Sequence, residues 1–258
     1  MAGGGNQTLV KTEVHLCCYN EAEILPYTLR HYGTFCSRIV IHDNFSTDGS
    51  REIAKAAGAE VVDWGTAGVI DETKLCEVKN EAWRGTDADW VIVGDADEFV
   101  YFPGGAEDTL AIYEVNGETV IKPHGFEMLA DEYPAGNGQI YDYVTMGAPD
   151  IKWYSKPALF SPKRVKTMSY GFGAHACTAT LYNGGVVSNP TKFTEPPSYL
   201  LHYKHLGGPE RLAAKYDGAY KRQLPIAHAN HWGNQEPGLK HAMDKRKLIL
   251  AGLQKVIS

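Results

Sequence analysis

The stretch DWVIVGDADEFVY, residues 89–101, decides the fold of this chain. Its first half is an apolar run that is typical of a buried strand and that ends at Gly94. Three acidic residues follow within four positions: Asp95, Asp97 and Glu98. Unpaired carboxylates are not tolerated inside a sheet. We therefore expect these side chains to lie where the strand leaves the sheet and to meet a cation there.

Strands and helices alternate through the first hundred residues. Strands are expected over residues 13–19, 38–42, 59–64 and 90–94, with helices over 22–32, 49–57 and 72–84 between them. This alternation predicts an α/β fold with a mostly parallel sheet and helices on both faces. In such sheets, ligands bind at the carboxyl ends of the strands. That rule places four polar residues on one rim: Asn20, Glu21, Asp43 and Asp95.

The second half of the chain is less regular. Residues 101–200 mix short apolar runs with loops rich in Gly, Pro and Tyr, which predicts mixed β structure over the rim. Helices are expected over 209–220 and 239–256. In the last helix we expect one apolar stripe to dock on the body of the protein, namely Leu239, Met243, Leu250, Leu253 and Ile257. Contact with a membrane surface is the alternative interpretation.

The composition is that of an ordinary globular protein, with 43% hydrophobic and 22% charged residues in a chain of 258. A net charge of −6 argues against nucleic-acid binding through bulk electrostatics. No apolar run approaches the roughly 18 residues that span a bilayer. Five scattered cysteines without a CxxC pair predict reduced side chains rather than disulfides or a zinc site. We expect a cytoplasmic protein with a disordered leader over residues 1–12 and one domain over 13–258.

The pair of carboxylates in Asp95-Ala96-Asp97 predicts a metal site. Two carboxylates at positions i and i+2 can reach one hard divalent cation, and oxygen ligands suit Mg²⁺ or Mn²⁺. An acidic turn that caps the next segment is the alternative, which the position after a buried strand disfavours.

Two other polar loops follow strands. In the loop over residues 43–50, helix capping by Thr47 or Asp48 leaves Asp43 unexplained, because Asp43 directly ends a strand and can accept hydrogen bonds from a ligand. At residues 18–21, a strand leads into a helix whose N-terminal amides favour an anion. Glu21 as a partner of the helix dipole is the alternative there.

Three segments together resemble the GT-A glycosyltransferases, specifically family 2-like enzymes: CYNEAEILPYTLRHY (18–32), RIVIHDNFSTDGSREIA (38–54) and DWVIVGDADEFVY (89–101). The resemblance covers about residues 13–101. It implies a nucleotide-sugar-binding half over 13–101 and an acceptor-side half with C-terminal helices over 102–258. By motif match it also implies contacts to the nucleotide-sugar from Tyr19, Asn20, Glu21, Asp43, Asn44, Ser46, Asp95 and Ala96, with Glu98 beside the metal or the substrate.

The resemblance further implies transfer of a sugar from a nucleotide-sugar, with a UDP-sugar favoured, to an acceptor hydroxyl with inversion. Mn²⁺ or Mg²⁺ on Asp95 and Asp97 would stabilise the leaving diphosphate. We expect one sugar per encounter, because the Gln-x-x-Arg-Trp motif of processive synthases is absent.

The remaining roles have weaker signals. A late histidine often completes the metal shell in these enzymes, and the candidates are His202 and then His175. Lys74 offers a second positive charge, with a solvated helix lysine as the alternative. The candidates for a carboxylate base are Glu127 and Asp131, with surface residues as the alternative.

Two rival functions stay open. A nucleotidyltransferase would share the acidic metal site, but it would begin with a Gly-rich basic loop where this chain has Tyr19-Asn20-Glu21. A non-catalytic carbohydrate-binding module would use the fifteen tyrosines and five tryptophans as stacking platforms. The acceptor also stays open between a glycan, a lipid-linked sugar, a protein side chain and a modified nucleobase.

Overall fold

The computed structural model describes residues 10–150, 153–190, 193–230 and 237–257, so most of the expected leader lies outside the described residues. The chain begins with four strands of one parallel sheet: β1 (Thr12–Cys18), β2 (Arg38–Asp43), β3 (Glu60–Asp63) and β4 (Trp90–Asp95). The sheet has the order β3-β2-β1-β4-β9-β6, with β6 (Val120–Ile121) and β9 (Leu159–Phe160) at its far edge. The predicted α/β fold with a mostly parallel sheet is confirmed.

Helices cover both faces of this sheet. The helices that follow the strands are α1 (Leu25–Tyr32), α2 (Ser50–Ala56), α3 (Glu72–Glu81) and α4 (Ala106–Val115). Side chains of α1, α2 and α4 share one core with Trp90 and Ile92 of β4. The alternate residues of the same strand, Val91 and Val93, pack into a second core beside Trp83. A strand with apolar residues on both sides must be covered on both sides, which explains its continuous apolar sequence.

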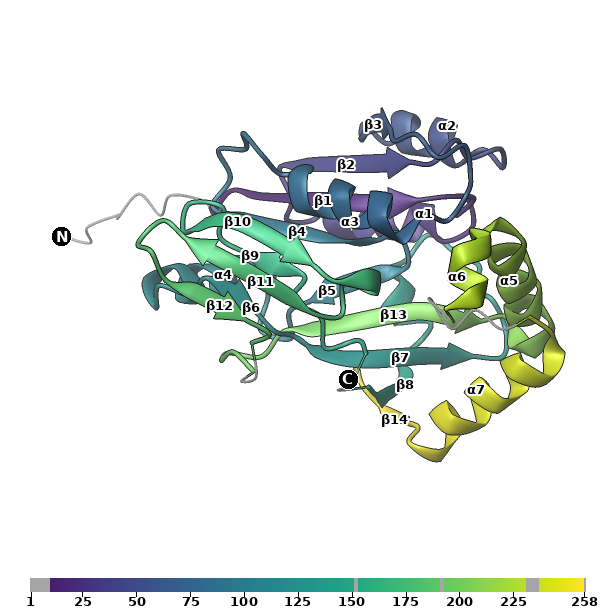
Figure 1. Cartoon of the computed structure of the whole chain (residues 1–258). Coiled ribbons are helices and arrows are strands. Elements are labelled where there is room, and N and C mark those ends of the chain that lie inside the picture. Colours follow the sequence, from purple (N-terminus) through teal and green to yellow (C-terminus); the bar gives the residue numbers. More distant parts are fainter. Residues whose placement is uncertain (1–9, 151–152, 191–192, 231–236, 258) are drawn as a thin grey trace.

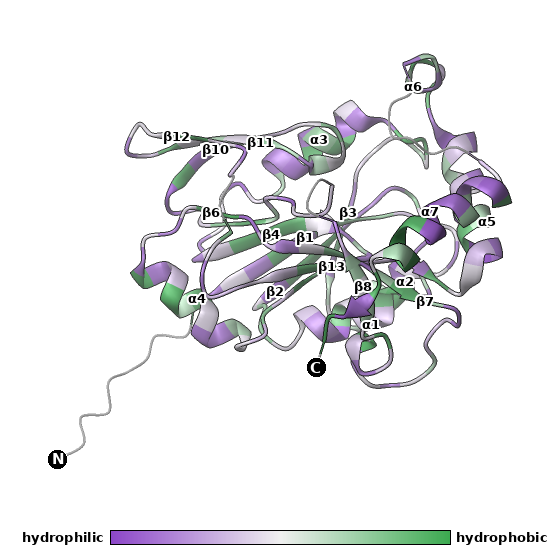
Figure 2. Ribbon diagram, turned by 90° about the horizontal axis from the view of Figure 1, so that it is seen from below, coloured by the Kyte–Doolittle hydropathy of each residue, from purple (hydrophilic) through white to green (hydrophobic). Residues whose placement is uncertain are grey.

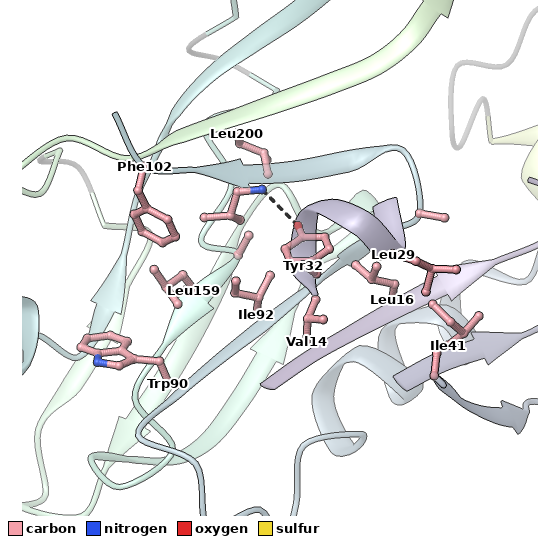
Figure 3. Close-up of a cluster of buried hydrophobic side chains, with 14 of the residues drawn as sticks. Val14, Leu16, Leu29, Tyr32, Ile41, Trp90, Ile92, Phe102, Leu159 and Leu200 are labelled. Atoms are coloured by element: carbon pink, nitrogen blue, oxygen red, sulfur yellow. Dashed lines mark hydrogen bonds between the residues drawn. The ribbon is translucent and has the colours of Figure 1, made fainter. Parts of the chain in front are cut away.

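Tyr32 ties α1 to this core (Figure 3). Its ring is fully buried near Val14 and Ile92. Its hydroxyl accepts a hydrogen bond of 3.0 Å from the backbone N–H of Val100 and donates one of 2.8 Å to the carbonyl of Glu98. The start of β5 is therefore fixed to α1 by a satisfied buried hydroxyl.

A second, five-stranded sheet has the order β14-β8-β7-β13-β5. Its strands are β5 (Glu98–Tyr101), β7 (His124–Ala130), β8 (Met146–Pro149), β13 (Tyr199–Leu206) and β14 (Gln254–Lys255). A third sheet of β10 (Val165–Tyr170), β11 (Cys177–Leu181) and β12 (Val186–Ser188) packs against α3. Short 3₁₀ turns lie at Ile140–Asp142 and Phe172–Ala174. The second half is thus mixed β structure, as expected.

The C-terminal helices are α5 (Gly208–Arg222), α6 (Pro225–Ala229) and α7 (Leu239–Ala251). In Figure 1 they lie at the side of the molecule toward which β1, β2, β7 and β13 point. Figure 2 shows that these helices contain both polar and apolar residues. The same view shows β1 and β4 running through the middle of the molecule. None of the described helices is long and apolar enough to cross a bilayer.

The prediction for the last helix was wrong in two respects. The helix ends at Ala251 rather than continuing to residue 256, because Gly252 follows and Gln254 and Lys255 pair with β8 as a strand. Three residues of the predicted apolar stripe are also not docked, because Leu239, Met243 and Leu250 are 43–50% exposed. Leu253 and Ile257 do pack against the body of the protein, but they lie beyond the end of the helix. The helix is instead buried through Ala242, Arg246 and Ile249.

Candidate active site at the carboxyl rim of the sheet

The acidic turn between β4 and β5 is anchored at its centre by Ala96. The Ala96 N–H donates to the carbonyl of Cys17 at 3.0 Å, and its own carbonyl accepts the hydroxyl of Thr28 at 2.7 Å. Ala96 is 2% exposed, so its side chain lies in the core. With its middle residue fixed inward, the turn presents Asp95 and Asp97 on the rim, where parallel strands of this kind bind ligands.

Asp95 is paired with a lysine that reaches it from α3. The Nζ of Lys79 lies 2.7 Å from Oδ1 of Asp95, and Nζ of Lys156 lies 4.0 Å from Oδ2. Lys156 also forms an ion pair with Glu98. Burial would raise the pKa of Asp95, but Lys79 and Lys156 outweigh it and hold that pKa below its ordinary value. Asp95 is therefore a carboxylate whose charge is already balanced from the interior side.

Asp97 faces a histidine with one oxygen and a lysine with the other. Its Oδ1 lies 3.7 Å from Nε2 of His202, and its Oδ2 lies 3.3 Å from Nζ of Lys215. Burial would raise the pKa of Asp97, but Lys215 and His202 outweigh it and lower that pKa. The structure thus brings together Asp97 and His202, which lie more than one hundred positions apart in the sequence.

His202 is oriented by the register of the second sheet. In that register His202 of β13 pairs with Glu127 of β7 on one side and with Glu98 of β5 on the other. Its Nδ1 lies 2.8 Å from Oε2 of Glu127, and the ring of Tyr154 stacks on the imidazole with centroids 4.1 Å apart. Burial would lower the pKa of His202, but Glu127 and Asp97 outweigh it and raise that pKa, which favours the charged ring. When the ring is neutral and Nδ1–H donates to a carboxylate, Nε2 carries the lone pair that a metal needs. That nitrogen is the one that faces Asp97.

Glu21 belongs to the same cluster. Its Oε2 lies 3.0 Å from Nζ of Lys215, and its N–H donates to the hydroxyl of Ser50 at 2.9 Å. Burial raises the pKa of the Glu21 carboxyl, with Lys215 acting in the opposite sense. Lys215 therefore connects the segment after β1 to the turn after β4.

Asp43, at the end of β2, has one satisfied oxygen and one without a partner. Its Oδ2 accepts the N–H of Ser46 at 2.9 Å and the guanidinium of Arg51 at 2.7 Å. Its Oδ1 is buried and has no hydrogen-bond partner among the described residues. Such an acceptor costs free energy unless a ligand supplies the missing donor.

The predicted residues around Asp43 hold two loops in place. The Asn20 N–H donates to Oγ of Ser46 at 2.8 Å, and the Asn20 side chain accepts the N–H of Thr47 at 2.7 Å. Oδ1 of Asn44 accepts the N–H of Gly68 at 3.2 Å. Asn20 and Ser46 thus join the loops after β1 and β2, and Asn44 joins β2 to the loop after β3.

Tyr19 lies beneath that last loop. The Arg222 guanidinium carbon lies 4.0 Å from the centre of the Tyr19 ring, and Arg222 also donates to the carbonyl of Gly68 at 3.0 Å. Gly68 has φ +84°, and a Cβ there would come within 2.8 Å of the Tyr19 ring. Arg222 therefore attaches the end of α5 to the rim through its contacts with Tyr19 and Gly68.

Three predicted residues make no direct contact with Asp97 or His202 among the contacts described, although the ring of His175 meets the Tyr154 ring that stacks on His202. The side chain of Lys74 is 55% exposed and pairs with Glu77. The side chain of Asp131 is 87% exposed and pairs with Arg246. His175 directs Nδ1 to the backbone carbonyl of Trp153 at 2.5 Å.

The sequence reasoning missed the lysines that pair with the acidic turn, Lys79, Lys156 and Lys215. A signal for Lys79 was present, because Cys76, Lys79 and Trp83 recur at helical spacing and place a lysine on the stripe of α3 that faces the sheet. No spacing rule connects Lys215 to Asp97, since their contact depends on how α5 crosses the rim.

The residues present fit a divalent cation only with help from other ligands. Among the described residues, no group of three or more His, Cys, Asp or Glu side chains is arranged to hold a metal. Asp97 Oδ1 and His202 Nε2 converge without a hydrogen bond between them, and Glu127 supports the histidine from behind. A carboxylate and an imidazole are suitable donors for Mn²⁺ or Mg²⁺ when phosphate oxygens and water complete the shell.

Comparison with solved structures gives partial likenesses. Glucosyl-3-phosphoglycerate synthase from Mycobacterium tuberculosis, solved with Mn²⁺, UDP and glucosyl-3-phosphoglycerate, is 19% identical with a TM-score of 0.33, covering 46% of this chain and 44% of that one. The same synthase with Mg²⁺ and UDP gives the same values. A mycobacterial protein is 18% identical with a TM-score of 0.29, covering 46% of this chain and 41% of that one. This chain therefore spans less than half the length of these proteins.

No curated protein matches the chain. The family model described as glycosyl transferase family 2 matches residues 13–181, which is well over half of the 258 residues. That match includes all three segments on which the resemblance was based, and it extends through β11. The predicted GT-A glycosyltransferase resemblance is confirmed, and the chain belongs to glycosyl transferase family 2.

Proposed function

We propose that this protein transfers one sugar from a nucleotide-sugar donor to an acceptor hydroxyl, with a divalent metal held by Asp97 and His202. The observation that carries the proposal is the approach of Asp97 Oδ1 to His202 Nε2, 3.7 Å apart at the carboxyl rim of a family 2 sheet. Mn²⁺ or Mg²⁺ bound there would stabilise the negative charge that develops on the leaving diphosphate.

The environment of Asp43 favours a sugar donor whose nucleotide base carries an N–H group. Its buried Oδ1 lacks a hydrogen-bond donor among the described residues, and Arg51 fixes the other oxygen. The imide N–H of uracil would satisfy this acceptor. Thymine and guanine also carry a ring N–H, and the family resemblance favours a UDP-sugar among these, with Tyr19, Asn20, Asn44 and Ser46 forming the surrounding rim.

Asp95 would act differently from Asp97 in this proposal. Its Oδ1 is occupied by Lys79 on the interior side, and a third of its side chain remains exposed. We assign Asp95 to the surface that receives the donor, next to the metal. Ala96, predicted to contact the donor, instead anchors the turn from the core. Lys79 and Lys156 keep the acidic turn from accumulating uncompensated charge.

Of the two predicted carboxylate bases, Glu127 belongs to the site and Asp131 faces solvent. Oε2 of Glu127 lies 2.8 Å from His202 Nδ1 and 3.4 Å from His205 Nε2, so this oxygen is engaged by histidines. We propose that Glu127 orients His202. An inverting transfer needs one carboxylate base, and neither residue is placed against an acceptor by its contacts.

The test is thermal unfolding with UDP, GDP, dTDP and CDP, each with and without Mn²⁺, on the wild type and on Asp97→Ala. A ligand that binds the native state must raise the melting temperature. We expect a Mn²⁺-dependent rise with UDP that Asp97→Ala abolishes. A folded wild type that responds to none of the nucleotides would overturn the proposal and favour a non-catalytic carbohydrate-binding module. A nucleotidyltransferase would instead release diphosphate from a nucleoside triphosphate.

A further inference from the structure

Each acidic side chain of the β4–β5 turn is paired with its own lysine. Asp95 pairs with Lys79, Glu98 with Lys156, and Asp97 with Lys215. These lysines come from three different parts of the chain, so the turn meets positive charge on several sides. The three pairs differ in the exposed fraction of the lysine side chain.

Two of the lysines are permanent parts of the interior. The side chains of Lys79 and Lys156 are 2% and 5% exposed, so an ammonium that left its carboxylate would stay buried without a counter-ion, which costs a large free energy. Lys215 is different, because its side chain is 24% exposed and it comes from α5 at the edge of the rim. Of these three lysines, Lys215 is the most exposed, so it can leave its carboxylate at the lowest cost.

Lys215 also has a second carboxylate to hold it. Its Nζ lies 3.0 Å from Glu21 Oε2 and 3.3 Å from Asp97 Oδ2. A lysine that leaves Asp97 therefore keeps an ion pair with Glu21 and stays on the rim. Asp97 keeps His202 on its other oxygen, Oδ1.

We propose that Lys215 is a built-in cation that occupies the Asp97 carboxylate until a divalent metal displaces it, and that the released ammonium then binds the donor's diphosphate. This inference rests on the proposed function, since it takes the metal to bind at Asp97 and His202. A metal at Oδ1 and the ammonium at Oδ2 repel each other across one carboxylate, so binding of the metal alone is weakened. The diphosphate brings enough negative charge to bind both cations, which makes metal and donor bind cooperatively.

The test measures Mn²⁺ binding by isothermal titration calorimetry, first alone and then with UDP. The variant is Lys215→Met, which keeps the aliphatic stem without the charge. Arg211→Met is the matched control, because Arg211 lies one turn earlier on α5 and pairs with Glu23 rather than with Asp97. It removes the same charge from the same helix. Lys215→Arg retains a cation at the site, and melting temperatures verify that all variants are folded.

We expect Lys215→Met to bind Mn²⁺ alone about five-fold or more tightly than the wild type, in the usual range of coupling between two sites. At saturating Mn²⁺ the same variant should bind UDP about five-fold or more weakly. Arg211→Met should change neither constant, and Lys215→Arg should lie near the wild type. The gain in Mn²⁺ affinity should vanish in Lys215→Met/Asp97→Ala.

The outcomes separate the two proposals. If the wild type binds Mn²⁺ in an Asp97-dependent manner but Lys215→Met binds it equally or more weakly, Lys215 is only a structural tie and this inference is wrong. An equal gain in Arg211→Met would also overturn it, because the effect would then be long-range electrostatics. If none of the variants with Asp97 binds Mn²⁺, with or without UDP, the metal assignment itself fails and this inference fails with it.

Discussion

The ammonium of Lys79 lies 2.7 Å from Oδ1 of Asp95 and is almost wholly buried, whereas the side chain of Asp95 is one third exposed. This unequal burial predicts unequal costs. Asp95→Asn leaves a buried ammonium without its nearest counter-ion, while Lys79→Met leaves a carboxylate that water reaches and that Lys156 still faces. We expect Asp95→Asn to lower the free energy of unfolding by about 3–5 kcal/mol and Lys79→Met by about 1–2 kcal/mol.

Urea unfolding at neutral pH measures both costs. The double variant Lys79→Met/Asp95→Asn should be more stable than Asp95→Asn alone, because it removes the unpaired charge as well as its partner. Equal losses for the two single variants would show that burial does not set the energetics of this pair.

Glu127 and Asp131 provide a second comparison, since both are carboxylates of the same region with opposite environments. Glu127→Gln should weaken Mn²⁺-dependent UDP binding by about 10- to 100-fold, because it removes the negative charge from the acceptor that fixes His202 and so weakens that hydrogen bond. Asp131→Asn should leave that binding unchanged, because its side chain is 87% exposed and pairs only with Arg246 among the contacts described. Calorimetric titration of UDP at fixed Mn²⁺ measures the UDP affinity of both variants. Unimpaired binding by a folded Glu127→Gln protein would refute the orienting role and return Glu127 to the candidates for the base.

Gly68 and Gly58 allow the contact with Tyr19 to be separated from backbone strain. Both have positive φ, +84° and +82°, so an alanine at either costs about 1–2 kcal/mol. A Cβ at Gly68 would come within 2.8 Å of the Tyr19 ring, whereas one at Gly58 has nothing within 4 Å. We expect Gly68→Ala to lose at least as much stability as Gly58→Ala, because it adds the clash to the strain, and only Gly68→Ala to lose UDP affinity. If Gly58→Ala weakens UDP binding to the same degree, the effect does not come from Tyr19.

His31 predicts a loss of stability in mild acid. Burial among Tyr32, Phe35, Phe99 and Tyr141 lowers the pKa of its imidazole from 6.5 to about 4, although the Val100 carbonyl acts in the opposite sense. Above pH 6.5 the ring is neutral in both the folded and the unfolded chain and adds no pH dependence. Below pH 6.5 the unfolded chain takes up the proton first, so the contribution of His31 to stability is lost progressively as the pH falls to about 4.

Urea unfolding at pH 7.5 and pH 5 tests this prediction against His31→Gln. Between these values His31 should account for about 2 kcal/mol of the wild-type loss, at 1.36 kcal/mol per pKa unit. The variant should therefore be the less pH-dependent protein by that amount. Parallel losses in the two proteins would mean that His31 takes up its proton in the folded state as readily as in the unfolded state.

The sequence was sufficient for the sheet and for the position of the rim. The strand over residues 90–94 was predictable because both of its faces are buried, which leaves a continuous apolar run. Parallel topology then places the ends of β1, β2 and β4 side by side without further information. The last helix was not predictable in the same way, because its period gives a stripe but not the direction of docking. Arg246, a charged residue, is buried on the docked face, where it forms an ion pair with Asp131.

The charge balance of the site was beyond sequence reasoning for a physical reason. A carboxylate cluster shows that cations must be near, but lysines have long side chains and reach it from any neighbouring element. Lys156 lies in the loop after β8, and its position in the sequence bears no regular spacing to Glu98. Lys215 lies on α5, far from Asp97 in the sequence. Only the tertiary fold decides which lysine meets which carboxylate.

The position of His202 in its sheet has a consequence for how this site can vary. His202 is opposite Glu98 on one neighbouring strand and opposite Glu127 on the other. Because side chains alternate between the faces of a sheet, a slip of one residue in β13 would turn the imidazole to the opposite face while leaving as many backbone hydrogen bonds as before. Accurate strand pairing during folding and correct assembly of the site are therefore one event. Insertion or deletion within β5, β7 or β13 therefore removes the histidine from the site.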